Sequence, residues 1–264
     1  MRYFISTNRV LIIFGLLILL LLSVSMDDTF AEITANANHD HITIDSFYHG
    51  STVSISGFSN PRDADLIIKL TSPDGHQSLR KKGKVANFLW MNTGELKIEN
   101  VPNVYFLYST KKIEDILSKE EMNKYVIGYP ALLEHASINV PAGEEKAKWF
   151  NEFIKFKESS KLFDTSVGKI STIKKGSKQD YSILTEWPYQ VPPGNYTAQV
   201  YAVKDKKVIE TAAANVLVEQ VGMVKSFADM AKNNAALYGL ISIVVALGAG
   251  FSVGMVFRKS GGAH

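Results

Sequence analysis

The chain has 264 residues with 29 Lys and Arg, 26 Asp and Glu, and no cysteine, which excludes disulfide bonds, thiolate metal sites and cysteine nucleophiles. Between Glu32 and Lys232 the charges nearly balance, with 25 basic against 24 acidic residues, so the basic excess that is typical of nucleic-acid binding is absent. The length suffices for one large or two small domains.

The N-terminal region has the order of features found in secretory signals. Arg2 and Arg9 precede the apolar run Val10 to Leu22, and small and polar residues follow it. This pattern predicts that residues 1–31 form a signal peptide. An uncleaved N-terminal anchor is the alternative, because the run is only slightly shorter than a membrane span. Under either interpretation the chain that follows is exported.

From His41 to Ser109 apolar residues recur at alternate positions, which is typical of strands with one buried face. The clearest alternating run is Thr52 to Phe58 (TVSISGF), and the continuous apolar run within Asp65 to Thr71 (DLIIKLT) predicts a buried strand. The segment Pro73 to Gly75 suits a turn and predicts a hairpin. We expect about six or seven short strands in this region.

Residues 111–165 change to a helical period. Within them, the segment Glu144 to Phe163 predicts the best helix, and the acidic pair Glu144-Glu145 suits its positive N-terminal end. Its apolar face comprises Trp149, Phe150, Phe153, Ile154 and Phe156. We expect a helical insertion whose aromatic side chains pack against the sheet.

Alternating strands resume at Val167 to Ile173, Tyr181 to Trp187, Asn195 to Lys204 and Lys207 to Glu219. The segment VPPGNY, residues 191–196, places a tyrosine after a Pro-Gly turn, which is typical of the tyrosine corner of an immunoglobulin-like sandwich. The sequence therefore predicts a mainly β fold, with one immunoglobulin-like β-sandwich over residues 38–221 that carries the helical insertion 111–165. Two small β domains are the alternative.

The C-terminal region predicts a membrane anchor. Residues 223–234 have the pattern of an amphipathic juxtamembrane helix, which would lie on the membrane surface or run on into the span. The uncharged segment Ala235 to Phe257 would reach about 35 Å as a helix, enough to cross a hydrocarbon core of about 30 Å. Arg258 and Lys259 follow, so we expect the tail 258–264 in the cytoplasm and the sandwich in the periplasm, beside the inner membrane.

Small residues within the predicted span repeat at intervals of four. Gly250 and Gly254 form a GxxxG pair, and Gly248 with Ser252 repeats the spacing two residues earlier. Such pairs let two helix backbones approach closely. We expect lateral association, in a homo-oligomer or with an integral membrane partner. The alternative is that glycine is simply common in membrane spans.

The cluster Arg80, Lys81, Lys82 and Lys84 lies close in sequence to Trp90 in a predicted hairpin. Because guanidinium and ammonium groups bind anions and lipid headgroups, these residues are candidates for contact with an anion or a partner. The alternative is a solvated strand edge, on which lysines discourage pairing with other strands.

His39 and His41 are the candidates for a metal site, because residues two apart lie on one side of an extended chain. No third ligand occurs at a fixed spacing, and a solvated strand edge explains the pair as well. The sequence contains no nucleophile elbow, HExxH motif, phosphate loop or glycine fingerprint. We therefore expect no cofactor and no enzymatic activity.

Several stretches resemble, in their order and spacing, the bacterial "putative transmembrane protein" family first catalogued from alphaproteobacteria. The matching stretches are Phe47 to Gly57, Arg80 to Lys82 with Trp90 to Asn92, Val101-Pro102 with Tyr105, Pro193 to Tyr196, and Leu237 to Gly239. The resemblance brings no catalytic residues with it. Members of this family are often encoded beside exporters similar to the TauE/SafE type, which implies a partner in sulfite or sulfonate export.

These patterns predict a non-enzymatic, single-pass accessory or interaction protein of the inner membrane. Its expected partner is an integral membrane protein such as a TauE/SafE-like anion exporter. The alternative is an extracytoplasmic binding module for an anionic solute or a metal ion.

Overall fold

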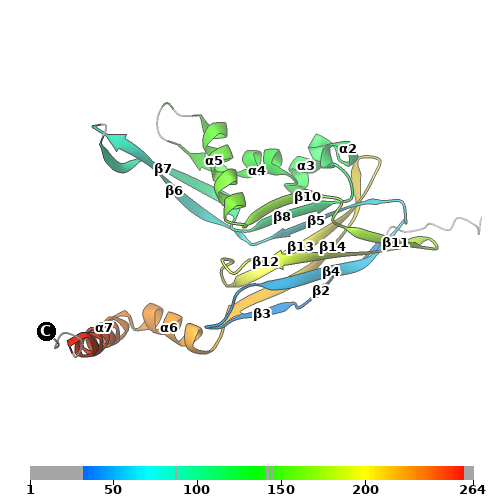
Figure 1. Ribbon diagram of the computed structural model, residues 1–264. Coiled ribbons are helices and arrows are strands. Elements are labelled where there is room, and N and C mark those ends of the chain that lie inside the picture. Colours follow the sequence, from blue (N-terminus) through cyan, green and yellow to red (C-terminus); the bar gives the residue numbers. More distant parts are fainter. Residues whose placement is uncertain (1–31, 87, 141–142, 144, 259–264) are drawn as a thin grey trace, which may run out of the picture.

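The computed structural model describes residues 32–258 apart from 87, 141–142 and 144. The predicted signal peptide, residues 1–31, and the tail after Arg258 lie outside the described residues. Strands account for 48% of the described residues and helices for 30%, and an apolar helix lies near the C-terminus (Figure 1). The prediction of a mainly β fold with a C-terminal apolar helix is therefore confirmed.

The described strands form three sheets (Figure 1). The first has the order β1-β4-β12-β11, with β2 also paired to β4; its strands are β1 (Glu32–Ile33), β2 (Asn36–Asn38), β4 (Ser51–Asn60), β11 (Ser171–Lys175) and β12 (Lys178–Trp187). The second has the order β10-β8-β5-β13-β14-β3; its strands are β3 (His41–Ile44), β5 (Asp65–Thr71), β8 (Tyr105–Ser109), β10 (Phe163–Val167), β13 (Gly194–Lys204) and β14 (Lys207–Gln220). The third comprises β6 (Asp74–Val85), β7 (Leu89–Pro102) and β9 (Ser137–Asn139).

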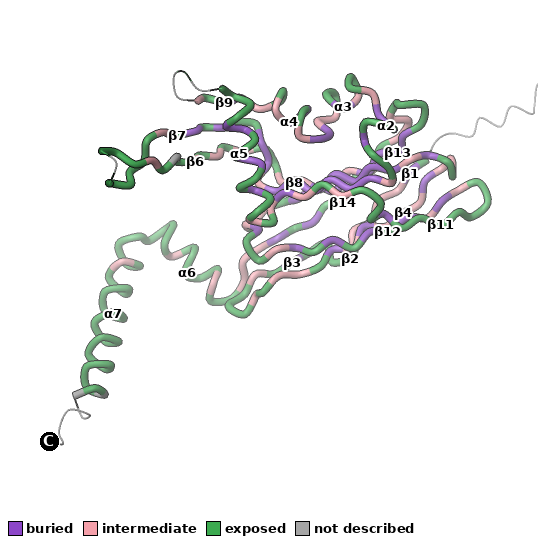
Figure 2. The backbone as a smooth tube through the Cα atoms, turned by 45° about the horizontal axis from the view of Figure 1, so that its top comes forward, coloured by how far each residue is buried: buried purple, intermediate pink, exposed green. Residues whose placement is uncertain are grey.

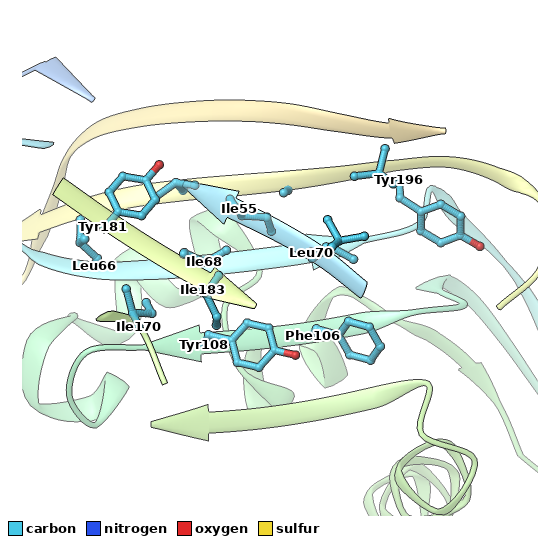
Figure 3. Close-up of a cluster of buried hydrophobic side chains, with 14 of the residues drawn as sticks. Ile55, Leu66, Ile68, Leu70, Phe106, Tyr108, Ile170, Tyr181, Ile183 and Tyr196 are labelled. Atoms are coloured by element: carbon cyan, nitrogen blue, oxygen red, sulfur yellow. The ribbon is translucent and has the colours of Figure 1, made fainter. Parts of the chain in front are cut away.

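The first and second sheets face each other and enclose an apolar core (Figure 3). On β12 every second side chain from Gln179 to Trp187 is buried, as expected for a sheet with one solvated face. On β5, in contrast, every residue from Leu66 to Leu70 is buried. Leu66 and Leu70 join the core between the sheets, whereas Ile67 joins a second core on the other face of the same sheet. The centre of the second sheet is therefore covered on both sides.

The predicted tyrosine corner is present. The Tyr196 hydroxyl donates a hydrogen bond to the backbone oxygen of Pro192 at 2.6 Å, and the Tyr196 ring packs edge-on against Trp187 at 4.9 Å between centroids. In immunoglobulin constant-type domains a sheet of strands A, B, E and D faces a sheet of C, F and G. The first sheet here has the corresponding order β1/β2, β4, β12 and β11. It faces the strands β5, β13 and β14 of the second sheet, which correspond to C, F and G. This correspondence favours the immunoglobulin-like interpretation.

Helices cover the outer face of the second sheet (Figure 1). They are α2 (Ile113–Ile116), α3 (Lys119–Tyr125), α4 (Tyr129–His135) and α5 (Lys146–Ser159). The prediction that Phe156 belongs to the buried face of α5 is wrong, because its side chain is half exposed. Lys157, four residues after buried Phe153 and thus on the same helical face, is buried in its place.

Two helices follow β14. α6 (Gly222–Asn233) and α7 (Ala235–Arg258) are separated by Asn234, whose φ of −137° and ψ of 53° are not helical, so the alternative of one continuous helix is wrong. The segment Ala235–Met255 of α7 has a mean hydropathy of 2.1, and none of it is buried within the chain. Its length and composition suffice to cross a membrane.

The strands before and after the helical insertion share both sandwich sheets. β4 pairs with β12, and β5 pairs with β13. β8, directly before the insertion, pairs in parallel with β10, whose first residue Phe163 lies inside the predicted insertion 111–165, so the helical part ends earlier than predicted. We propose on this basis that residues 38–221 fold as one unit, with the insertion 111–165 as part of it, and not as two small domains.

Two lysines are buried beside the helical layer. The Lys69 ammonium donates to the backbone oxygen of Tyr125 at 2.6 Å, and the Lys157 ammonium donates to the backbone oxygen of Asn103 at 3.0 Å. Burial disfavours the charged form and lowers the pKa of each lysine to about 8. The same desolvation raises the pKa of the buried Tyr105 hydroxyl.

Unfolding of the full-length protein in detergent is expected to show one cooperative transition, because removing either strand set would leave both sandwich sheets incomplete. Far-ultraviolet circular dichroism and tryptophan fluorescence should give the same midpoint, since Trp187 and Trp149 lie in different cores. A stable proteolytic fragment that ends within residues 111–165 and keeps its strand signal would contradict the single unit.

Stability should rise with pH between about 8 and 9.5 and fall at higher pH, where the unfolded chain loses the protons of seven tyrosines whose pKa burial raises in the folded chain. In the rising window the unfolded chain binds more protons at Lys69 and Lys157 than the folded chain does, so raising the pH favours folding, by on the order of 1 kcal/mol per lysine. At higher pH the unfolded chain loses tyrosine protons that Tyr105 retains when folded. Thermal midpoints measured across this range test the profile, and Lys69→Met with Lys157→Met should remove its rising part.

Candidate functional site

The β6–β7 hairpin carries the predicted basic cluster, and its two halves differ in burial. In the inner half Leu96 and Ile98 are buried in the second core, and β9 pairs with β7 from Lys97 to Glu99. Beyond the pair Arg80–Glu95, no other described strand pairs with the hairpin, which leaves the body of the protein (Figures 1 and 2). We call residues 80–86 and 88–94 the hairpin tip.

One face of the hairpin tip is basic. Lys84 pairs with Trp90 and Lys82 pairs with Asn92, and residues paired across a ladder share one face. Arg80 lies two residues before Lys82 in the same strand and therefore projects to the same side. Lys81 lies between Arg80 and Lys82 in the strand, and its side chain lies outside what the structure describes.

The other face of the hairpin tip is apolar. Val85 pairs with Leu89, and Met91 pairs with Gly83, so these three apolar side chains share a face. They are 44%, 50% and 49% exposed, and Phe88 beside them is 79% exposed. Exposed apolar side chains that adjoin one another, in contrast to single ones, indicate an interaction surface.

A bulge in β7 produces this separation of basic and apolar residues. Lys81 pairs with Gly94 but Lys82 pairs with Asn92, so Thr93 is an extra residue in β7. Without the bulge Met91 would lie opposite Lys84, on the basic face. A Cβ added at Gly83 would lie 2.6 Å from the Thr93 hydroxyl oxygen, so the bulge requires glycine at that position.

The charges of the basic face are not neutralised by carboxylates among the described residues. Arg80, Lys82 and Lys84 form no ion pair there. Glu95 lies opposite Arg80, and its carboxylate accepts a hydrogen bond from the Ser78 hydroxyl at 2.9 Å. The Lys84 ammonium lies 5.3 Å from the centre of the Trp90 ring, within range of a cation–π interaction. The face therefore presents positive charge next to an aromatic ring that is 64% exposed.

The hairpin and the C-terminal helices leave the same end of the sandwich. β5 and β14 are both antiparallel to β13, so they run in the same direction, and they end at Thr71 and Gln220 respectively. The hairpin follows the first strand, and α6 follows the second (Figures 1 and 2). Exposed Phe47 lies just after β3, which runs parallel to β14, and exposed Tyr189 lies just after β12, so both belong to loops at this end.

The candidate metal ligands His39 and His41 have no cluster of ligands around them. His41 Nε2 lies 2.8 Å from the Glu219 carboxylate on β14, and His39 is exposed. Among the described residues, no group of three or more His, Asp or Glu side chains is placed to hold a metal ion.

The small residues of α7 have open surroundings within the chain. A Cβ added at Gly248, Gly250 or Gly254 would meet nothing within 4 Å outside the local helix backbone. The Ser252 hydroxyl donates to the backbone oxygen of Gly248 at 2.8 Å, so its hydrogen bond is satisfied within the helix.

Sequence reasoning missed a hollow at the same end of the sandwich. It measures about 750 Å³ and lies between the segments 49–52 and 186–190, the last residue of α5, Ser159, and Lys161, which follows α5. These segments are far apart in the chain, and only the pairing of β4 with β12 brings the first two together. A short sequence motif therefore does not predict this hollow.

An apolar C-terminal helix that no part of the described chain covers, joined to a β-rich domain, indicates a membrane protein, with one candidate span among residues 32–258. Comparison with known families matches residues 32–259 to the family described as "Putative transmembrane protein (Alph_Pro_TM)". The chain belongs to this family, as its sequence motifs indicated. A comparison with curated proteins finds no match.

Substitutions at the hairpin tip should leave the fold intact, in contrast to substitutions in the inner half. Val85→Ser with Met91→Ser removes exposed side chains and should change the free energy of unfolding by less than about 0.5 kcal/mol. Ile98→Ala opens a cavity in the second core and should cost about 2–5 kcal/mol. Denaturant unfolding of the full-length variants measures both. A large loss from the tip variant would mean that its apolar residues serve folding.

Proposed function

We propose that this membrane protein is a non-enzymatic accessory or interaction subunit that presents its sandwich to an integral membrane partner. The observation that carries the proposal is α7, which has no buried residue in the segment Ala235–Met255. A span with no buried residue in its own chain must pack on lipid or on another helix. Gly250 and Gly254, which are open to approach, support a helix partner, either a second copy or a different protein.

The connection between the span and the sandwich supports a role in presentation. β14 is paired on both sides, with β13 and with β3, and leads directly into α6. α6 therefore starts from a firmly held strand and not from a long linker. This arrangement keeps the ectodomain close to the membrane, where it can contact the exposed parts of an integral protein.

The orientation and the partner class are further parts of the proposal. Arg258 and Lys259 follow the span, and by the positive-inside rule they place the C-terminus in the cytoplasm and the sandwich in the periplasm of a bacterial inner membrane. For the partner we propose an anion exporter of the TauE/SafE type. That part rests on the genomic surroundings that the family resemblance implies.

A binding module for an anionic solute is the second candidate, favoured by the basic face of the hairpin tip. Arg80, Lys82 and Lys84 offer positive charge beside Trp90. Solute sites, however, are usually concave and largely enclose the ligand, whereas this face projects from the body (Figure 1). Calorimetry of the full-length protein with sulfite, sulfonates and phosphate separates the two candidates, because an accessory subunit needs no affinity for these anions.

Affinity purification of the full-length protein from its native membrane should recover an integral membrane protein in stoichiometric amount. The double substitution Gly250→Ile and Gly254→Ile should reduce that recovery by at least about tenfold, because the added side chains separate the helix backbones. Mass spectrometry identifies the partner, and crosslinking between tagged copies measures self-association.

Leu247→Ile is the matched control, since it changes an apolar side chain of α7 without altering the small residues and should leave recovery unchanged. Unchanged recovery and crosslinking in the double glycine variant would exclude this helix surface as the interface. Recovery of no integral protein, together with anion binding in the calorimeter, would favour the solute-binding candidate.

A further inference from the structure

From the hairpin tip we infer a second membrane-contact site. Its apolar residues Val85, Phe88, Leu89 and Met91 would enter the leaflet that faces the ectodomain, while its basic face binds lipid phosphates. This inference concerns the lipid surface, goes beyond the proposed function, and requires no protein partner.

The apolar residues of the hairpin tip are exposed to water, which is unfavourable for apolar surface. Phe88 is 79% exposed, and the three side chains of the apolar face are about half exposed, at the outermost part of a hairpin with which no other described strand pairs there. The inner half of the same hairpin keeps its apolar residues Leu96 and Ile98 buried. The fold thus covers apolar side chains where the hairpin meets the body and leaves them uncovered only where it projects.

The spacing of charges along the hairpin fits the thickness of a lipid headgroup layer. Lys84 and Lys82 lie one and three residues behind Val85, which places them about 3 and 10 Å further from the end of the strand. The headgroup region of a leaflet is about 5–8 Å deep, so these ammonium groups would reach the phosphates when Val85 reaches the acyl chains. Trp90 lies opposite Lys84 and therefore at the same depth, in the interfacial layer where tryptophan is enriched in membrane proteins.

The charge of the basic face complements a membrane surface. Arg80, Lys82 and Lys84 share one sign, and no described carboxylate forms an ion pair with them. A bilayer containing anionic lipid presents a continuous layer of phosphates to Lys82 and Lys84, and its negative surface potential also attracts Arg80, which lies further out. A protein partner would need several carboxylates at matching positions beside an apolar surface, so the lipid explains both faces with fewer requirements.

The position of the hairpin makes contact with the same bilayer feasible. It leaves the sandwich at the end from which α6 and α7 depart, and the loops with Phe47 and Tyr189 lie at that end too (Figures 1 and 2). The tip extends about 17 Å beyond the inner half, measured from Arg80 to Val85, and α6 is about 18 Å long. The two lengths are similar, so the tip can reach the bilayer to which α6 leads. Because α7 already holds the chain at the membrane, insertion of the tip is intramolecular, and a low intrinsic affinity suffices.

Trp90 supplies a direct test in the full-length protein reconstituted into bilayers. It is exposed, whereas Trp149 and Trp187, which complete the three tryptophans of the chain, are buried. Lipids brominated along the acyl chain quench tryptophan that enters the bilayer. In vesicles of equal phosphatidylcholine and phosphatidylglycerol, brominated lipid should reduce the Trp90 emission, obtained as the difference between the wild type and Trp90→Phe, by about twofold or more.

Variants separate the two faces of the tip. Val85→Asp with Met91→Asp should abolish the quenching, and Lys82→Glu with Lys84→Glu should weaken it in vesicles that contain phosphatidylglycerol but much less in phosphatidylcholine alone. Ile173→Asp and Lys174→Glu are the matched controls, because these exposed residues lie on β11, which pairs with the part of β12 farthest from Trp187, at the opposite end of the sandwich. They should leave the quenching unchanged.

Equal Trp90 emission in brominated and plain lipid would overturn the inference. Emission that is insensitive to bromine in vesicles, but is shielded from acrylamide in native membranes, would assign the tip to a protein partner and would equally overturn it. Neither result depends on whether a partner is recovered in the purification described above, so the inference and the proposed function fail independently.

Discussion

Burial of the second sheet on both faces is the constraint on which the rest of the structure depends. Alternate residues of β5 and β13 enter different cores, as Val200 and Tyr201 show: the first lies in the sandwich core and the second in the helical core. A sheet with two apolar faces is stable only between two covering layers. The first sheet supplies one layer, and the helices with the inner half of the β6–β7 hairpin supply the other. The helices thus share a core with the sheet, which supports the proposal that the insertion folds as part of one unit.

The period of the apolar residues predicted most of the strands and helices, because the burial of a segment is visible in its own sequence. It failed at the end of the insertion: the helix predicted to run to Phe163 ends at Ser159, and Phe163 begins β10. The unbroken apolar run in β5 indicated a strand without a solvated face, and the PPGNY segment indicated the hydrogen bond from Tyr196. The pairing was not predictable in the same way. Ile55 pairs with Ile183 across the whole helical insertion, and a period of two specifies a face but not a partner.

For the candidate site, too, the sequence indicated the residues but not their arrangement. Composition alone singled out Arg80, Lys82, Lys84 and Trp90, but their separation from the apolar residues depends on a one-residue bulge at Thr93. A bulge changes register without changing composition, so no count of charges reveals it. The exchange of Phe156 for Lys157 on the buried face of α5 has a related cause. The long lysine side chain buries its methylene groups and still reaches a backbone oxygen of Asn103.

The junction between β14 and α6 has a mechanical consequence. A force that acts on the ectodomain against its membrane anchor is transmitted through Gly222 to the end of β14 and pulls this strand along its own axis. β14 is paired with β13 on one side and with β3 on the other, and ladder hydrogen bonds lie across the strand direction. Such a pull shears both ladders at once and does not open them one bond after another. The anchor is thus attached where the sheet resists tension best, whereas an edge strand such as β11 would peel away under a smaller force.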